Sequence, residues 1–184
     1  MFVELNEGLK TIDGCAFCEC ESLEYVIIPD SVDYLGMSAF ADCKSLKYAS
    51  IGKGVESECI WIFDGCESLE KIDVDPDNEC FSSIDGVMYN KDATVLIKYP
   101  EGRNADPFVI PDTVETVGEY SFTKTKSLLS VTISKNIEKI DETAFGECGS
   151  LHSFSVVTEN PYYSSENGIL YDKEKSTLVR YPSA

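Results

Sequence analysis

Positive charge is scarce in this sequence. Its 184 residues include 15 Lys and Arg and one His against 33 Asp and Glu, which gives a formal net charge of −18. Such a surface repels the phosphates of nucleic acids and of anionic membranes, so neither is expected as a partner. The apolar fraction of 43% still suffices for a packed core, and the length suits one domain.

Long apolar stretches are also missing. No run approaches the ~18–20 residues of a membrane-spanning helix, so no membrane insertion is predicted. The first ten residues, MFVELNEGLK, lack the basic start and the apolar stretch of a signal peptide. On this evidence the protein is either intracellular or secreted with its signal segment outside this chain.

Catalytic signatures are few. His152 is the only histidine, no Cys or Ser carries a local nucleophile motif, and no glycine-rich phosphate loop occurs. Carboxylates are abundant, but spacing singles out no pair of them. We therefore predict a protein that is not an enzyme and that has no cofactor.

Metal-ligand spacing is weak as well. Residues 73–79, DVDPDNE, carry acids at the first, third and fifth positions, as a calcium-binding loop does. The segment lacks the glycine at position six, where Asn78 stands, and the glutamate at position twelve, where Ile84 stands. We interpret it as a solvated acidic turn and predict no metal site.

An internal repeat dominates what is present. CAFCECESL at 15–23 recurs as SAFADCKSL at 38–46, WIFDGCESL at 61–69, YSFTKTKSL at 120–128 and TAFGECGSL at 143–151. The central phenylalanines are Phe17, Phe40, Phe63, Phe122 and Phe145, so the steps are 23, 23, 59 and 23 residues. A fixed period of this length indicates a solenoid, whose units cannot bury their apolar faces alone.

The long step contains an insertion that also repeats. NECFSSIDGVMYNKDATVLIKYP at 78–100 returns as NPYYSSENGILYDKEKSTLVRYP at 160–182. Asp85-Gly86 and Asn167-Gly168 stand at equivalent places and are typical of tight β-hairpin turns. We predict a hairpin insertion near each of these two ranges.

Each short unit follows the same order of elements. After Ser-Leu, apolar residues alternate, as in Val26 and Ile28 or Val131 and Ile133, which predicts a strand with one buried face. The Ala-Phe pair that follows is expected in a short helical turn. Stacked units would form a parallel sheet, giving an α/β repeat solenoid of about seven coils by strand count.

The cysteines fit the repeat rather than a metal or redox site. Cys20, Cys43, Cys66 and Cys148 occupy one position, three residues before the repeat leucine, and Thr125 fills it in the remaining unit. A position that accepts Cys or Thr once per coil indicates a buried structural column, in which a free thiol acts as a small apolar group. Stacked cysteines have poor disulfide geometry, so mostly free thiols are predicted.

The pattern AFxxCxSLxxVxIPxSVxxIGxxAF resembles the leucine-rich repeats of the BspA-like type, found on bacterial surface proteins. Residues 22–46, SLEYVIIPDSVDYLGMSAFADCKSL, match it almost throughout, and the resemblance covers essentially the whole chain. The resemblance implies a right-handed solenoid with the LxxVxI strands on its concave side. It also implies a secreted or cell-surface location and adhesion to host or cell-surface protein ligands, without catalytic residues or cofactor.

Two features depart from the family pattern. In the third unit Glu58 stands where other units have Leu35 or Val117, and Ile62 replaces the alanine, so Ile60 is expected inward and Trp61 outward. Neither end of residues 1–184 shows a recognisable polar cap, although solenoids need caps for solubility. We expect a single solenoid that is a piece of a longer array.

The outward strand positions supply the candidate site. Two adjacent columns cross the N-terminal half, and the predicted ligand-binding residues on them are Tyr25, Ile27, Tyr48, Lys71 and Asp73. Aromatic side chains on a rigid sheet make good protein or glycan contacts, although stacked rings also stabilise adjacent strands. Trp61 and Tyr120 offer an alternative contact surface on the opposite side if they are exposed.

The predicted function is therefore that of a non-catalytic binding module, with a host matrix or cell-surface protein as its partner. Two alternatives remain open. The array could be a structural spacer, or its surface could bind a glycan. A binder, unlike a spacer, should show a contiguous exposed apolar or aromatic patch.

Overall fold

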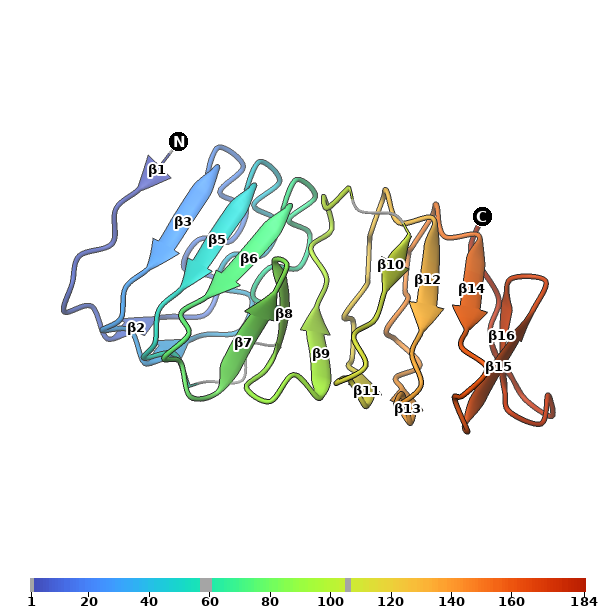
Figure 1. The fold of residues 1–184 in the computed structure, drawn as a ribbon. Helices are drawn as coiled ribbons and strands as arrows, with labels where there is room; N and C mark the ends of the chain where they lie inside the picture. The colour runs from blue at the N-terminus through green and yellow to red at the C-terminus, as the bar shows by residue number, and fades with distance from the viewer. Residues whose placement is uncertain (1, 57–60, 105–106) are drawn as a thin grey trace.

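A computed structural model describes residues 2–56, 61–104 and 107–184. These residues form strands and turns but no helix, and the chain advances from β1 at one end to the hairpin of β15 and β16 at the other (Figure 1). Successive coils lie side by side along one axis, which is the arrangement that the repeat predicts.

Two parallel sheets form one side of the solenoid, which we call the strand face. It contains β1 (Phe2–Val3), β3 (Tyr25–Ile28), β5 (Tyr48–Ile51) and β6 (Lys71–Val74), then β10 (Phe108–Val109), β12 (Ser130–Ile133) and β14 (Ser153–Val156). All neighbouring pairs within these two sheets are parallel, with Tyr25 opposite Tyr48 and Tyr48 opposite Lys71. In β3 every second side chain is buried, because alternate residues of a strand point to opposite faces.

The seven described strands of this face correspond to about six turns of solenoid. This is one turn fewer than the seven coils predicted from the sequence. A second set of short strands runs along another side of the coils. β2 (Thr11–Ile12) pairs with β4 (Tyr34–Leu35), and β11 (Thr116–Val117) pairs with β13 (Lys139–Ile140), all in parallel. Ile12, Leu35 and Val117 are buried there.

The expected helical turns are wrong for the described residues, because the Ala-Phe segments are hydrogen-bonded turns. Within one coil Ala41 N–H donates to Ser38 O at 3.0 Å, whereas Phe40 N–H donates to Ile62 O of the next coil at 3.0 Å. Ser38 and Asp42 have φ of 57° and 56°, in the left-handed region that interrupts a right-handed helix. Alternate amides therefore join neighbouring coils instead of closing a helix.

Both hairpin insertions are present, with left-handed turn residues that match their sequences. β7 (Phe81–Ile84) and β8 (Val87–Asn90) pair antiparallel around Asp85 and Gly86, whose φ values are 50° and 78°. β15 (Tyr163–Glu166) and β16 (Ile169–Asp172) repeat this arrangement and continue into β17 (Leu178–Arg180). Two positive φ angles define the tight turn that Asp-Gly and Asn-Gly favour.

The insertion also completes a coil, which the sequence pattern did not indicate. Its third strand, β9 (Val95–Lys98), pairs in parallel with β11, so that Leu96 lies opposite Val117. Tyr99 then stacks on Phe122 with ring centroids 5.2 Å apart, in the place that a repeat phenylalanine takes elsewhere. Residues 95–99 thus supply the inner wall of the fourth turn.

A buried asparagine fixes the start of each insertion. The Asn78 amide donates to Gly52 O and Val55 O at 3.0 Å and accepts from the backbone N–H groups of Cys80 and Phe81. Asn160 makes the equivalent four bonds in the second insertion and is likewise fully buried. Asn78, at position six of the acidic segment 73–79, therefore stabilises the fold by forming hydrogen bonds with buried backbone groups.

The apolar interior has two clusters that meet at β8. Met88 belongs to the N-terminal cluster and its neighbour Val87 to the C-terminal one. Stacked repeat rings line both, with Phe17 and Phe40 at 4.9 Å in the first and Phe122 and Phe145 at 4.8 Å in the second. The hairpin is thus the point at which the two cores join.

Candidate functional site

The N-terminal half of the strand face carries an exposed aromatic and aliphatic patch. Phe2, Tyr25 and Ile27 are 55%, 44% and 52% exposed, and Tyr48 is half-buried beside them. Phe2, Tyr25, Tyr48 and Lys71 follow one another in register across four strands. The structure brings the five predicted residues together on this patch, which we call the tyrosine patch: Tyr25, Ile27, Tyr48, Lys71 and Asp73.

An ion pair fixes one edge of the tyrosine patch. Lys71 Nζ lies 2.6 Å from Asp73 Oδ2, and the Tyr48 hydroxyl donates to the same oxygen at 3.1 Å. The Lys71 ammonium also lies 5.9 Å from the centre of the Tyr48 ring, within the range of a cation–π contact. The Asp73 contacts raise the pKa of Lys71, which keeps it charged. The Tyr48 ring is thereby held in one orientation, which reduces the ordering cost of binding.

The first hairpin bounds the patch on its far side. Ile72 N–H donates to Gly86 O at 2.9 Å, and a Cβ built on Gly86 would lie 2.4 Å from Lys71 Cγ. Only a residue without a side chain permits this close approach. The hairpin tip therefore lies against β6, a contact that the sequence did not indicate because it depends on how the insertion folds back.

A shallow hollow of about 420 Å³ adjoins the patch at the carboxyl ends of β3, β5 and β6. Its lining includes Ile27 and four acidic side chains, Glu7, Asp30, Asp73 and Asp75. Lys53 lowers the pKa of Asp30, mainly through a backbone hydrogen bond to the carboxylate and secondly through an ion pair at 3.1 Å. Ionised carboxylates around an exposed isoleucine favour a partner that is both apolar and basic.

The C-terminal half of the strand face is different. The columns that continue those of Tyr25 and Ile27 there consist mainly of Ser130, Ser153, Thr132 and Ser155. The same columns contain one exposed large apolar side chain in the described residues, Val109, which is 58% exposed. The candidate surface is therefore confined to the first four strands of the face.

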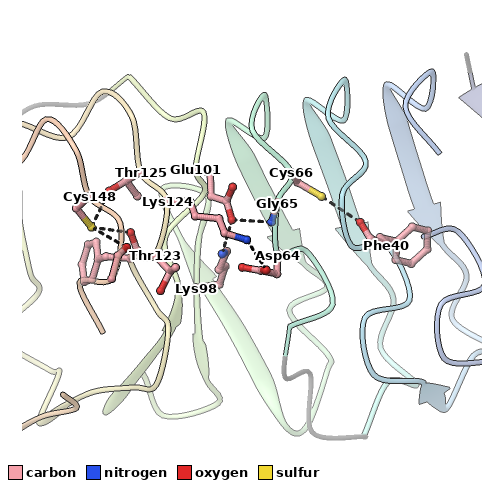
Figure 2. A network of polar contacts seen from close by, with 12 residues as sticks. Phe40, Asp64, Gly65, Cys66, Lys98, Glu101, Thr123, Lys124, Thr125 and Cys148 are labelled. Carbon is pink, nitrogen blue, oxygen red and sulfur yellow. Dashed lines mark hydrogen bonds and ion pairs between the residues drawn. The ribbon is translucent and has the colours of Figure 1, made fainter. Parts of the chain in front are cut away.

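The cysteine column lies inside the coils. Cys43, Cys66 and Cys148 are fully buried and Cys20 is half-buried, and the described cysteines are free thiols. Each buried thiol donates to the carbonyl of the previous coil's phenylalanine, as Cys66 Sγ does to Phe40 O at 3.1 Å (Figure 2). Burial raises the pKa of the Cys148 thiol, which keeps it protonated and able to donate.

A polar network connects the third coil to the coil after the insertion (Figure 2). The fully buried Glu101 accepts from Gly65 N–H at 3.0 Å and pairs with Lys98 at 2.9 Å. Close by, Lys124 Nζ lies 2.8 Å from Asp64 Oδ2. Burial raises the pKa of Glu101, and Lys98 opposes that rise. Sequence reasoning missed Glu101, because nothing in its local pattern distinguishes it from the other acids.

The irregular third unit is described in part. Glu58 and Ile60 lie outside the described residues, while Ile62 is buried and Trp61 is 40% exposed. The Trp61 ring contacts Tyr120 edge-on, with centroids 5.5 Å apart. The alternative contact surface is thus accessible, and it lies away from the tyrosine patch.

The described residues also bear on metal binding, membrane crossing and the single histidine. They contain no group of three or more His, Cys, Asp or Glu side chains placed to hold a metal ion. No helix among them could cross a membrane. His152 is exposed, and its Nδ1 lies 3.0 Å from Ser150 O.

Comparison with known proteins agrees with this architecture. A family model described as BspA type leucine rich repeat region matches residues 2–96 and 98–181 in six copies. Among solved structures, the pneumococcal vaccine antigen PcpA matches with a TM-score of 0.66 and 29% identity, over 82% of this chain and 43% of that one. No curated protein matches the chain.

Two further solved structures share the fold at lower identity. A leucine-rich repeat protein from Eubacterium ventriosum matches at 23% identity and a TM-score of 0.54, over 82% of this chain and 58% of that one. One from Bacteroides ovatus matches at 23% identity and a TM-score of 0.52, over 84% and 43%. The chain therefore spans only 43–58% of the length of these structural relatives.

Proposed function

The chain belongs to the BspA-type leucine-rich repeat family of bacterial surface proteins, and we propose that it binds a protein ligand through the tyrosine patch of its strand face. In this proposal it works as a non-catalytic module of a secreted or cell-surface protein. Adhesion to a host matrix or cell-surface protein is the biological role that we infer.

The observation that carries the proposal is the asymmetry of the strand face. Tyr25, Ile27 and Phe2 form a contiguous exposed patch on one half, whereas the equivalent positions of the other half are mostly Ser and Thr. Contiguous exposed apolar groups on a folded surface mark interaction sites more often than scattered ones do. Tyrosines in such a patch combine a large contact area with a hydroxyl for directed hydrogen bonds.

The chemistry of the patch also indicates the kind of ligand. Asp30 and Asp73 beside the apolar centre are paired with Lys53 and Lys71, but Glu7 and Asp75 add further negative charge there, and the chain carries a net charge of −18. A basic surface with an apolar protrusion complements this arrangement and is guided to it by electrostatic attraction. A rigid sheet loses little conformational freedom on binding, so the contacts of a few side chains suffice for measurable affinity.

The test is binding of the purified chain to immobilised matrix proteins, fibrinogen and mucin glycans at ~0.15 M salt, where long-range attraction is screened. We expect saturable binding to one protein ligand, and a loss of at least tenfold in affinity when Tyr25 and Tyr48 are both replaced by Ser. The matched control is Tyr34→Ser, because Tyr34 is 48% exposed but lies on β4, on another side of the coil.

The same experiment separates the alternatives. Saturation with mucin glycans alone would support a carbohydrate ligand at the patch. Absence of binding across the whole panel would favour the spacer role. Binding that survives the double tyrosine substitution would place the ligand elsewhere on the chain and overturn the assignment of the patch.

A further inference from the structure

The ladder of hydrogen bonds that joins successive Ala-Phe turns has a gap at the third coil. Phe17 N–H donates to Ala39 O, Phe40 N–H to Ile62 O, and Phe122 N–H to Ala144 O. The equivalent N–H of Phe63 has no acceptor within the described part of the chain. The insertion causes this gap, because its short Lys98–Glu101 segment stands where a full Ala-Phe turn would otherwise pack.

Part of the gap is closed by side chains. In the second coil, Asp42 N–H donates to Asp64 O of the third coil. The equivalent amide of the third coil, Gly65 N–H, donates instead to the carboxylate of Glu101. On the other side of the gap, Tyr99 N–H takes Ser121 O as its acceptor. Within the described residues, the N–H groups of Trp61 and Phe63 are therefore left without an acceptor.

A cavity of about 320 Å³ lies at this gap. Its apolar lining comes from the third coil, the hairpin and β9, through Ile62, Phe63, Phe81, Met88, Val95 and Ile97. Trp61 and Tyr120 complete it with their edge-to-face ring pair. The volume lies at the lower end of the ~300–1,000 Å³ found for ligand clefts, and such apolar clefts bind one compact apolar group.

The charges beside the cavity are mostly negative or already neutralised. Lys98 is paired with Glu101 and Lys124 with Asp64. Glu119 lines the cavity, is exposed, and has no salt-bridge partner in the part of the chain that the structure describes. Glu147 lines an adjoining hollow that shares Trp61 and Tyr120 with the cavity. Among the described residues, the charged groups left without a salt-bridge partner beside the cavity are thus the carboxylates of Glu119 and Glu147, and they favour a ligand that carries a positively charged group.

We propose that this cavity, the junction pocket, binds an extended peptide segment of a partner protein that carries one large apolar side chain next to a lysine or arginine. The apolar side chain fills the cavity against Trp61 and Tyr120, and the basic residue pairs with Glu119. A peptide carbonyl accepts from Phe63 N–H and so restores the missing rung of the ladder, as strand addition does at open sheet edges. A glycan fits less well, because the lining offers few unused polar groups.

This site is separate from the tyrosine patch and does not depend on it. Trp61 is the only tryptophan of the chain, so its fluorescence reports occupancy of the junction pocket directly. The probe is an acetylated and amidated pentapeptide of sequence GKFKG, titrated into the protein at ~0.15 M salt. Two matched peptides, GEFEG and GKSKG, test the need for positive charge and for the apolar side chain.

We expect a saturable blue shift of Trp61 emission with GKFKG, at least tenfold weaker binding of GEFEG, and no saturation with GKSKG. Glu119→Gln should weaken GKFKG binding threefold or more without affecting the fold, since Glu119 is exposed and unpaired. Tyr120→Asn should also weaken it, and asparagine tolerates the φ of 53° at this position. Tyr25→Ser, on the strand face, should leave the titration unchanged.

Three results would overturn the proposal. They are the absence of any saturable change with GKFKG, equal binding of all three peptides, and binding that neither Glu119→Gln nor Tyr120→Asn weakens. Loss of matrix-protein binding in the Tyr25 and Tyr48 double variant concerns the tyrosine patch alone. The two sites can therefore fail independently.

Discussion

The carboxylate of Glu101 accepts a hydrogen bond from the backbone N–H of Gly65 at 3.0 Å, in the buried layer where the insertion meets the third coil. In the preceding coil the corresponding N–H, that of Asp42, donates to the backbone carbonyl of Asp64. A side-chain oxygen thus replaces a backbone oxygen at the place where the first insertion interrupts the repeat. Burying the Glu101 carboxylate is unfavourable, and the ion pair with Lys98 at 2.9 Å offsets part of this cost.

Replacing Glu101 by glutamine should not destabilise the protein at neutral pH, whereas replacing it by alanine should. Glutamine keeps an acceptor for Gly65 N–H and removes a charge whose burial raises the pKa of the acid. Alanine leaves the buried N–H without an acceptor, at a cost of about 1–3 kcal/mol. Urea unfolding of the three proteins measures both effects. A destabilised glutamine variant at pH 7 would show that the ion pair with Lys98 outweighs desolvation.

The pH dependence of the glutamine variant has a defined sign. The pKa of Glu101 is raised above its ordinary value of 4.5 in the folded state, so its contribution to stability is present at low pH and is lost as pH rises through the raised pKa. Glutamine does not titrate, so the stability of Glu101→Gln relative to the unmodified protein should increase with pH above 4.5. Urea unfolding at a series of pH values measures this slope.

Glu67→Gln is the control for this slope. The hydrogen bond and ion pair with Lys126 lower the pKa of Glu67, so its contribution is lost as pH falls. The stability of Glu67→Gln relative to the unmodified protein should therefore decrease with rising pH. Slopes of the same sign for both variants would contradict the buried location of Glu101.

Replacing Cys148 should reveal whether its thiol acts as a donor or only as filler. Cys148 Sγ donates to Phe122 O at 3.1 Å and accepts from the Thr125 hydroxyl at 3.3 Å. Alanine removes both roles and leaves a small void, for an expected loss of about 1–3 kcal/mol in unfolding free energy. Serine should cost less, because its hydroxyl can both donate and accept, and a hydroxyl already stands at the equivalent position, Thr125, where it donates to Cys148 Sγ. Thermal unfolding, with the exposed Cys15→Ser as control, measures the difference.

Asn78→Ala should be among the most damaging single substitutions in the chain. It removes four hydrogen bonds to buried backbone groups of two coils, at an expected cost of about 2–4 kcal/mol. Asn136→Ala is the matched control, because the Asn136 amide is exposed and bonds to Asp112 O. Equal destabilisation of both variants, measured by urea unfolding, would contradict the anchoring role of Asn78.

Glu147→Gly should stabilise the protein slightly. Glu147 has a φ of 54°, and the third coil already has glycine at the equivalent position, Gly65, with a φ of 73°. A non-glycine residue in this region is strained by about 1–2 kcal/mol, of which part is offset by the greater freedom of glycine in the unfolded chain. The exposed Glu142, which lacks a positive φ, is the control, and its replacement by glycine should destabilise. Thermal midpoints compare the two variants.

We propose that the chain unfolds as one unit despite its two apolar clusters. β8 contributes Met88 to one cluster and Val87 to the other, so neither can open without exposing the hairpin. We expect the fluorescence of Trp61, which lies in the third coil, to change at the same urea concentration as far-UV circular dichroism. Two separated transitions would show that the halves are independent domains, as happens when coupling between neighbouring repeats is weak.

Much of the fold follows from local patterns in the sequence. The alternation around Val26 and Ile28 predicted the strand face and its register, because period two leaves one way to bury both residues. Asp85-Gly86 predicted the hairpin turn, because both residues tolerate a positive φ. The Ala-Phe segments were mispredicted as helical, because a short apolar segment with turn residues does not reveal whether its amides bond within the coil or to the next one.

The sequence by itself determined the repeat, the strand register and the position of the tyrosine patch, since each depends on residues within one or two neighbouring coils. Only the tertiary structure decided the role of Glu101, the contact of Gly86 with Lys71, and the pocket between Trp61 and Tyr120. These pairs of residues lie 36, 15 and 59 positions apart along the chain, and each pair meets because of the insertion. Their proximity depends on how the hairpin folds back between coils, and no periodic pattern encodes that path.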